Sequence, residues 1–263
     1  MSRLIPPRRA FSLVELLAVV AIIMIMLALL SPLLGQMRER GRMVTCLGNL
    51  KQFGTAILTF TANHDGYLTA TISTGSYQGS EPWQKGWMGR EALPDGMAAP
   101  RGWYNEYGVL KDYLSSDTLK RRIFRCPSLE QGALGSGVGS NGIHDYGMHA
   151  AFSGAKTSLL PTRASVARPD GKVLTVPAPI FSEEEPAYGL NDSYIDPDHT
   201  SINREGSWHA GRASNYFATD GSSHTVQWGA SPGPQVYSWL AKAPSGNVVS
   251  LGNVYGWAAW NRQ

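Results

Sequence analysis

Acids and imidazoles in the second half of the chain are the residue types that hydrolytic metal centres use. They are Asp196, Asp198, His199, His209, Asp220 and His224. Their spacing matches neither an H-E-x-x-H signature nor an ordered D-x-D-x-D-G calcium loop, so the sequence predicts no metal site. We expect turn formers and loop hydrogen-bond partners instead. Calcium held by the oxygen-rich loops at 191–192 and 196–198 is the one cofactor that stays open.

Other catalytic signatures are missing from the sequence. It contains no G-x-S-x-G elbow, no P-loop, no dinucleotide fingerprint and no C-x-x-C pair. Nothing therefore indicates nucleophilic or nucleotide chemistry, and we expect a protein that is not an enzyme. The net charge of +3 comes without a dense run of Lys and Arg, which argues against a nucleic-acid partner.

The chain has two cysteines, Cys46 and Cys126. In an oxidising compartment they can form one disulfide. Such a bridge would close a loop of about 80 residues and add a few kcal/mol by the chain-entropy model. The alternative is two unpaired buried thiols. We predict the disulfide on condition that the body of the protein lies outside the cytoplasm.

A single carboxylate stands at the edge of the most apolar segment. Leu16 to Leu30 is apolar without a break, and Glu15 comes immediately before it. The run approaches the roughly 20 residues that span a bilayer core. A carboxylate near the membrane costs a few kcal/mol by insertion scales, so it indicates a function.

The flanks of this segment indicate its orientation. Arginines cluster before it at Arg3, Arg8 and Arg9. This basic flank should hold the N-terminus in the cytoplasm and leave the body outside. No A-x-A-like site follows the run, which argues against an ordinary secretory signal peptide. A simple signal anchor fits the hydropathy but gives no reason for Glu15.

The sequence AFSLVELL at positions 10–17 resembles the processing signature of type IV prepilins. In that family a membrane-embedded peptidase cuts just before the Phe and methylates the new N-terminus. The resemblance implies cleavage between Ala10 and Phe11, methylation of Phe11, and Glu15 as the fifth mature residue. It also matches Pro32 to the proline that commonly kinks pilin helices. The family usually has Gly where this chain has Ala10, which is still a small residue.

The same resemblance implies a physical role for Glu15. Pilin helices pack together in a filament core that excludes water. There a carboxylate can neutralise the N-terminal amine of a neighbouring subunit, so that two buried single charges become a pair. Removing one partner is expected to cost several kcal/mol. The implied partners are prepilin peptidase, other pilin or pseudopilin subunits, and inner-membrane lipid.

Further stretches resemble a large family of bacterial prepilin-like proteins. Two are C-L-G-N-L-K-Q-F-G-T-A from Cys46 and F-R-C-P-S around Cys126. A third is Y-G-M-H, in which His149 replaces the usual Asn. The C-terminal pattern H-…-N-x-x-F-x-D-G is matched by His209, Asn215, Phe217, Asp220 and Gly221. Here ten residues separate His from Asp-Gly, where the family commonly has nine.

The elements that must position these residues follow from periodicity. Apolar residues recur at intervals of three and four, namely Leu47, Leu50, Phe53, Ile57 and Phe60. They predict one helix from about Ser12 to about Asn63, bent near Pro32, whose second half packs on a globular body. Residues 171–181 and 213–228 predict strands, the second as a hairpin. Segments 131–142 and 182–201 predict surface loops.

The sequence therefore predicts an α+β protein with a long N-terminal helix and an antiparallel sheet. We expect a basic leader at 1–10, a helix at 11–63 and an extracytoplasmic globular domain at 64–263. Residues 11–35 would lie in the membrane or filament core, and residues 36–63 would be amphipathic. The favoured function is a subunit of a type IV pilus or type II secretion pseudopilus. The alternative is a membrane-tethered periplasmic binding or hydrolytic domain that uses the segment only as an anchor.

Overall fold

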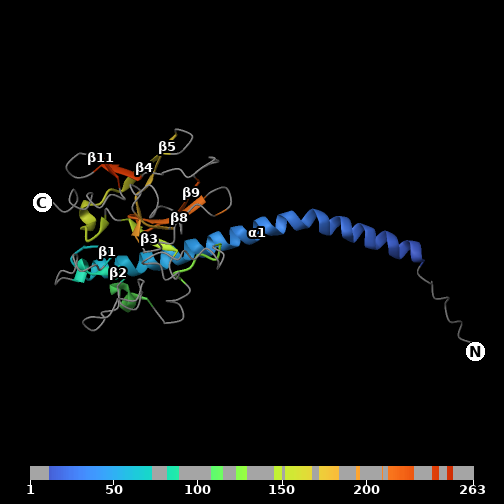
Figure 1. Cartoon of the computed structure of the whole chain (residues 1–263), viewed down its shortest axis with the longest axis horizontal. Coiled ribbons are helices and arrows are strands. Elements are labelled where there is room, and N and C mark those ends of the chain that lie inside the picture. The colour runs from blue at the N-terminus through green and yellow to red at the C-terminus, as the bar shows by residue number, and fades with distance from the viewer. Residues whose placement is uncertain are drawn as a thin grey trace, which may run out of the picture. The chain divides into compact units, whose positions relative to one another are not determined.

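The computed structural model of the chain is drawn as a cartoon in Figure 1. The described residues are 12–72, 82–88, 108–114, 123–128, 145–149, 152–167, 172–183, 194–195, 209, 213–227, 239–242 and 248–250. They form one long helix and several small, mainly antiparallel sheets. This confirms the predicted α+β class. The predicted leader, with Ala10, and the predicted mature N-terminus, Phe11, lie outside the described residues.

Helix α1 runs from Leu13 to Ala62 and includes Pro32. These ends lie within one residue of the predicted ones. The chain divides into two compact units, residues 1–41 and residues 42–263. In the described part of the first unit, from residue 12 on, the large apolar side chains are exposed, with Leu29 exposed by 73%. Among the described residues, α1 is the one helix long and apolar enough to cross a membrane.

In the second unit, one face of α1 is buried. Its buried residues are Cys46, Asn49, Leu50, Phe53, Gly54, Ala56, Ile57, Phe60 and Thr61. Steps of three and four keep these positions on one side of an α-helix. The prediction began this stripe at Leu47, but Leu47 is only half-buried and Cys46 is fully buried. The buried face of the helix therefore includes Cys46 and Asn49 instead of Leu47. Both have side chains that can bind a ligand or a backbone group.

A five-stranded sheet has the order β7-β3-β6-β8-β9. Its strands are β3 (Tyr146–His149), β6 (Pro179–Glu183), β7 (Tyr194–Ile195), β8 (Ala213–Ala218) and β9 (Ser223–Gln227). Neighbouring strands are antiparallel except for β3 and β7, which are parallel. The predicted hairpin is β8 and β9. Every residue of β3, β6 and β8 is buried, so these three strands form the centre of the domain.

Two smaller sheets complete the described strands. A four-stranded antiparallel sheet joins β11 (Val248–Ser250), β10 (Trp239–Lys242), β4 (Arg163–Ala167) and β5 (Val173–Pro177) in that order. A parallel pair joins β1 (Ala70–Ile72) to β2 (Gly86–Met88). The predicted strand at 171–181 is in fact two strands, β5 and β6, which belong to different sheets. The chain changes sheet at Ala178, between Pro177 and Pro179, each of which lacks the N–H that a ladder needs.

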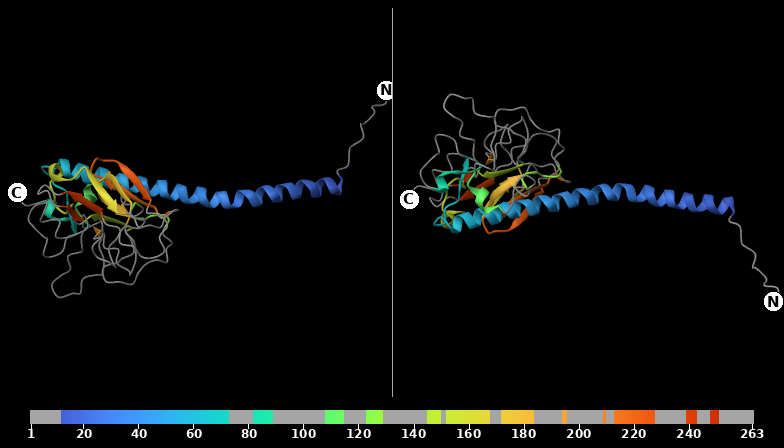
Figure 2. Two further views of the ribbon diagram at one scale, coloured as in Figure 1. Left: turned by 90° about the horizontal axis from the view of Figure 1, so that it is seen from above. Right: turned by 90° about the horizontal axis from the view of Figure 1, so that it is seen from below.

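Aromatic rings fill the space between the helix and the sheet. The centroid of the Phe53 ring lies 4.8 Å from that of Phe124, 5.6 Å from Tyr146 and 5.9 Å from Trp87. All four side chains are at most 1% exposed. Rings at such separations stabilise a core beyond the area that they bury. Figure 2 shows from two sides that the strands gather around the second half of α1.

Gly54 allows helix α1 to approach strand β8 closely. A Cβ atom added at Gly54 would lie 2.2 Å from ring carbons of Phe217, nearer than real Cβ atoms come to other atoms. The Phe217 ring therefore occupies the space that a side chain at Gly54 would need. At Gly48, which lies on the same helix before Gly54, an added Cβ would meet no atom within 4 Å. The close approach is specific to Gly54.

His149, at the end of β3, lies fully buried and binds the hydroxyl of Ser182 on β6 at 2.6 Å. Burial lowers the pKa of His149 from 6.5 to about 3. The unfolded chain therefore takes up a proton at this position before the folded chain does, as the pH falls below 6.5. The stabilisation from keeping His149 neutral is fully present above pH 6.5 and is lost as the pH falls toward 3.

We predict that His149→Asn will reduce the loss of stability in acid. Between about pH 7.5 and about pH 5, His149 should account for about 2 kcal/mol of the loss in wild-type unfolding free energy. Urea unfolding followed by tryptophan fluorescence at both pH values measures this difference, and comparison with His149→Asn cancels the titration of other groups. Equal losses in the two proteins would contradict the neutral, buried state of His149.

Candidate functional site

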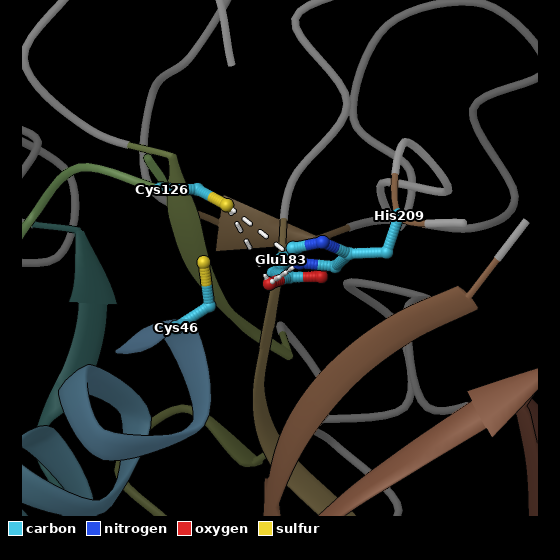
Figure 3. A group of neighbouring side chains, drawn as sticks. All are labelled: Cys46, Cys126, Glu183 and His209. Carbon is cyan, nitrogen blue, oxygen red and sulfur yellow. Dashed lines mark hydrogen bonds and ion pairs between the residues drawn. The ribbon is translucent and has the colours of Figure 1, made fainter. Parts of the chain in front are cut away.

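Four side chains that can bind metal ions meet where helix α1 faces the sheet (Figure 3). They are Cys46, Cys126, Glu183 and His209. One ligand atom from each residue, a sulfur, a carboxylate oxygen or a ring nitrogen, lies within 4.8 Å of all the others. No side chain in the group is more than 2% exposed. We call these four residues the buried cluster.

Each member of the buried cluster comes from a different part of the fold. Cys46 lies on the buried face of α1, and Glu183 ends strand β6. Cys126 belongs to the turn at 123–128, and His209 forms an isolated bridge with Ala213 at the start of β8. The cluster thus joins the helix to the central strands of the sheet.

The shortest contact in the cluster joins His209 to Glu183. The Nε2 atom of His209 lies 2.8 Å from Oε1 of Glu183. The sulfur of Cys126 lies 3.7 Å from the same ring nitrogen and 3.9 Å from the same oxygen. Cys126, Glu183 and His209 therefore direct their ligand atoms toward a common point, with the sulfur of Cys46 beside them.

Residues around the cluster orient His209 and Glu183. The hydroxyl of Ser128 lies 3.1 Å from Nδ1 of His209, so the other ring nitrogen faces the cluster. Asn215 donates its backbone N–H to Oε2 of Glu183 at 2.8 Å and its side-chain N–H to Oε1 at 3.0 Å. The amide oxygen of Asn215 accepts a hydrogen bond from Thr225 at 2.6 Å. These contacts hold the carboxylate and the imidazole in one orientation.

The turn that carries Cys126 is bound on both sides. The backbone N–H of Cys126 donates to Oδ2 of Asp145 at 2.7 Å. The side-chain amide of Asn49 donates to the carbonyl of Arg125 at 3.1 Å and to the hydroxyl of Tyr146 at 3.2 Å. Asn49 lies one turn beyond Cys46 on α1, so the same helix face supplies a cluster residue and the residue that positions the turn.

The two thiols of the cluster have different proton affinities. A hydrogen bond from Cys46 lowers the pKa of Cys126 to about 5, with help from His209 and against the effect of burial. The same hydrogen bond, together with burial, raises the pKa of Cys46. Of the two thiols, Cys126 is therefore the one whose surroundings favour the thiolate form. A thiolate is the form of cysteine that binds metals and reacts.

The pKa values of two acids near the thiols, Glu183 and Asp145, are raised. Burial raises the pKa of Glu183, although its hydrogen bond with His209 opposes this. Burial also raises the pKa of Asp145 to about 7, against the N–H of Cys126. Two carboxyl groups and two thiols thus share a water-poor region with the imidazole of His209, and burial disfavours the charged forms of the acids. Buried charges of one sign are costly unless a cation compensates for them.

The predicted disulfide is not confirmed. No bond joins Cys46 to Cys126, both of which the structure describes, although both are buried and their sulfurs lie within 4.8 Å. The two sulfurs nonetheless lie in the same buried cluster. What the arrangement adds is a carboxylate and an imidazole beside the two sulfurs.

The C-terminal sequence pattern divides between two places. His209 and Asn215 reach the cluster, whereas Phe217 packs in the core against Gly54. Asp220 and Gly221 form the tight turn between β8 and β9, where Gly221 has a φ of +84° and Asp220 accepts the N–H of Ser222 at 2.9 Å. A positive φ favours glycine at this turn. The pattern thus combines site residues with residues that shape the fold.

Among the other predicted residues, His224 lies on β9, stacked on Tyr216 with ring centroids 5.3 Å apart. It is not part of the cluster. Asp196, Asp198 and His199, with the proposed calcium loops at 191–192 and 196–198, lie outside the described residues.

Glu183 is the member of the buried cluster that the sequence did not indicate. The run Ser182-Glu183-Glu184-Glu185 begins the segment 182–201, for which the sequence predicts a surface loop. This is wrong for Ser182 and Glu183, which are fully buried in β6. The available signal was continuity, since only Ser182 separates Glu183 from the apolar residues Ile180 and Phe181.

At the other end of the described chain, Glu15 caps its own helix. The N–H of Ser12 donates to Oε2 of Glu15 at 2.9 Å, and the hydroxyl of Ser12 accepts the N–H of Val14 at 3.3 Å. This is the arrangement of a capping box, S-x-x-E, at a helix N-terminus. Glu15 and the apolar side chains after it are exposed. An acid in the first turn also suits the positive end of the helix dipole.

Two families match the chain, and their ranges adjoin closely. Residues 6–31 match the prokaryotic N-terminal methylation motif. Residues 35–239 match a family described as protein of unknown function (DUF1559). No curated protein and no solved structure matches the chain.

The first match spans the predicted cleavage site and Glu15. The second spans the second half of the helix and all four members of the buried cluster. The chain therefore belongs to the DUF1559 family, as a prepilin-like protein with an N-terminal methylation motif before the family domain.

Proposed function

We propose that this protein is a pilin-like subunit that assembles through its N-terminal helix into a type IV pilus or a type II secretion pseudopilus. Prepilin peptidase would cut between Ala10 and Phe11 and methylate Phe11. The leader would then be residues 1–10, the helix residues 11–63 and the globular domain residues 64–263. The observation that carries this proposal is the place of Glu15, inside a methylation motif and in the first turn of a helix whose apolar side chains are exposed.

The exposed apolar surface of α1 requires an apolar environment. Its side chains from Leu13 to Leu34 are mostly about half exposed or more, among them Leu29 at 73% and Leu16 at 59%. Soluble monomers rarely expose an apolar surface that extensive and continuous. Membrane lipid can cover it before assembly, and the same helices of neighbouring subunits can cover it in a filament. The partners that we propose are therefore inner-membrane lipid, prepilin peptidase and other pilin-like subunits.

Charge favours one orientation in the membrane. The arginines before the apolar run favour a cytoplasmic N-terminus, and the globular domain would then lie in the periplasm. The protein would begin as a single-pass inner-membrane protein and move into the polymer after cleavage. We propose a structural role and no enzymatic activity.

Cleavage followed by entry into a polymer separates a pilin-like subunit from a tethered domain that only borrows an anchor. Ala10→Glu should block cleavage, because the signature requires a small residue there and the variant places a bulky acid. We expect the full leader to remain and filaments containing a tagged copy to disappear, as judged by mass spectrometry and immunogold imaging. Ala10→Gly, which restores the usual residue of the signature, is the matched control and should be cut and assembled.

Filaments from the Ala10→Glu strain that still contain this chain would contradict the proposed function. So would a wild-type strain in which the leader is cut but the tagged chain never enters any polymer. The second result would favour a membrane-tethered periplasmic binding or hydrolytic domain.

A further inference from the structure

We propose that Cys46, Cys126, Glu183 and His209 bind one zinc ion that ties the helix to the sheet. This inference does not depend on filament assembly, since it concerns how the globular domain is held together. The two sulfurs, one nitrogen and one oxygen are four donors, which is the number that a structural zinc site takes.

The kinds of donor favour zinc over other common metals. Thiolate sulfur and imidazole nitrogen suit zinc, whereas calcium and magnesium prefer sites made of oxygen. Only one of the four donors, the carboxylate of Glu183, is an oxygen. A calcium ion at these residues is therefore disfavoured.

The spacing of the donors is close to what zinc needs. Zinc bonds of about 2.0 to 2.3 Å in a tetrahedron place the ligand atoms about 3.3 to 3.8 Å apart. The sulfur of Cys126 lies 3.7 Å from the nitrogen of His209 and 3.9 Å from the oxygen of Glu183. The nitrogen and the oxygen lie 2.8 Å apart. Binding zinc requires these last two atoms to separate by about half an ångström. A pair of donors at the 4.8 Å limit of the cluster would have to approach by about 1 Å, and both changes are within side-chain motion.

The surroundings match those of a built metal site. Ligands in such sites use their second polar atom to bind neighbouring residues, which fixes their orientation. His209 does so through Nδ1 to Ser128, and Glu183 does so through Oε2 to the backbone N–H of Asn215. Asp145 fixes the backbone at Cys126. Three of the four proposed ligands are therefore oriented by a hydrogen bond to a residue outside the cluster.

Charge supplies a further reason for a cation. Glu183 and His209 have side chains that are 0% exposed, and Asp145 lies beside them at 4% exposure. A disulfide between the cysteines would need no carboxylate and no imidazole beside it. A divalent cation compensates for the carboxylate and the thiolates at once, which makes their burial together favourable.

The site would be structural because it is closed. Catalytic zinc keeps a coordination position open for water or substrate, whereas structural zinc is bound by four protein ligands. Here four ligands converge, and none is more than 2% exposed. The zinc would link helix α1 to β6, to the turn at Cys126 and to the start of β8.

The test uses the full chain, purified from membranes in detergent with an affinity tag that contains no histidine. Elemental analysis should find about one zinc per chain, as expected for a closed site. Replacing the zinc by cobalt should give the visible bands of a tetrahedral ion and a sulfur-to-cobalt charge-transfer band. The spectrum reports coordination directly in the wild-type fold, so it does not depend on variants that fail to fold.

Variants should fall into three groups. Cys46→Ser and His209→Ala should each lose the bound metal. Their charge-transfer band should be absent or weaker than that of the wild type. Asn215→Ala, which removes an outer partner, should bind about 10- to 100-fold more weakly. His224→Gln, an imidazole change on β9 outside the cluster, should bind like the wild type.

Either of two results would overturn the inference. One is a wild-type chain that contains no zinc, binds no cobalt and gives a Cys46–Cys126 disulfide or two freely alkylated thiols in peptide maps. The other is zinc that is bound equally well by the wild type, Cys46→Ser and His209→Ala, because the metal would then lie elsewhere.

Discussion

Cells that carry Glu15→Leu should insert and cut the protein normally, yet make no polymer that contains it. Leucine is more favourable in a bilayer than glutamate, so insertion should be unimpaired. The residues on either side of the proposed cut, Ala10 and Phe11, are untouched. In the filament core, however, the amine of a neighbouring Phe11 would lose its counter-charge and remain buried without a partner, which costs about 3–5 kcal/mol per contact. The membrane pool should persist while the sheared polymer disappears.

Glu15→Leu removes both the charge of Glu15 and the hydrogen bond that it accepts from the N–H of Ser12. A control is therefore needed that removes the charge and keeps the hydrogen bond. Glu15→Gln keeps an acceptor at this position, since glutamine also serves in capping boxes, but removes the charge. If the charge matters for assembly, Glu15→Gln should fail as Glu15→Leu does. Glu15→Asp, which keeps the charge with a shorter reach, should give intermediate amounts of polymer.

Quantitative blots of membrane and sheared fractions measure these outcomes. If Glu15→Gln makes normal polymer and Glu15→Leu makes none, Glu15 acts in assembly only as a helix cap and its charge is not needed. Normal polymer from Glu15→Leu would remove the assembly role of this residue altogether.

Gly54→Ala should destabilise the globular domain strongly for a change of one methyl group. The new Cβ would lie 2.2 Å from ring carbons of Phe217, whose side chain is only 1% exposed. The ring cannot move without displacing its buried neighbours, and overpacking of this kind costs about 1–3 kcal/mol. The cost should exceed the gain in helix propensity that alanine brings.

Gly48→Ala is the matched control on the same helix. An added Cβ there meets no atom within 4 Å, so only the propensity gain of up to about 1 kcal/mol should remain. Urea unfolding should therefore move in opposite directions for the two variants. If Gly54→Ala proved as stable as Gly48→Ala, the close contact between α1 and β8 would be refuted.

The helix and the hairpin could be predicted from sequence because their signals are local. The apolar run after Glu15 and the stripe from Leu50 to Phe60 predict helix α1. The predicted ends, about Ser12 and about Asn63, each lie within one residue of the observed ends. The Asp220-Gly221 pair marks the turn between β8 and β9. Such features depend on neighbours within one or two turns of the chain, so no knowledge of the fold is needed.

The buried cluster could not be predicted in this way. Cys126 and His209 are 83 positions apart, and Cys126 and Glu183 are 57 apart. Only the pairing of β3, β6 and β8 brings them together, and sequence spacing does not report strand order. The two cysteines and His209 belong to separate sequence patterns, and Glu183 belongs to a run of three acids. Two cysteines considered alone indicate a disulfide, and the neighbouring carboxylate and imidazole become apparent only in the fold.

Mass spectrometry of the sheared polymer fraction from wild-type cells tests the central claim most directly. The account predicts that this fraction contains the chain and that its N-terminal peptide begins at Phe11 carrying one added methyl group. A polymer fraction that lacks the chain, or contains it only with residues 1–10 attached, would contradict assembly of a processed pilin-like subunit.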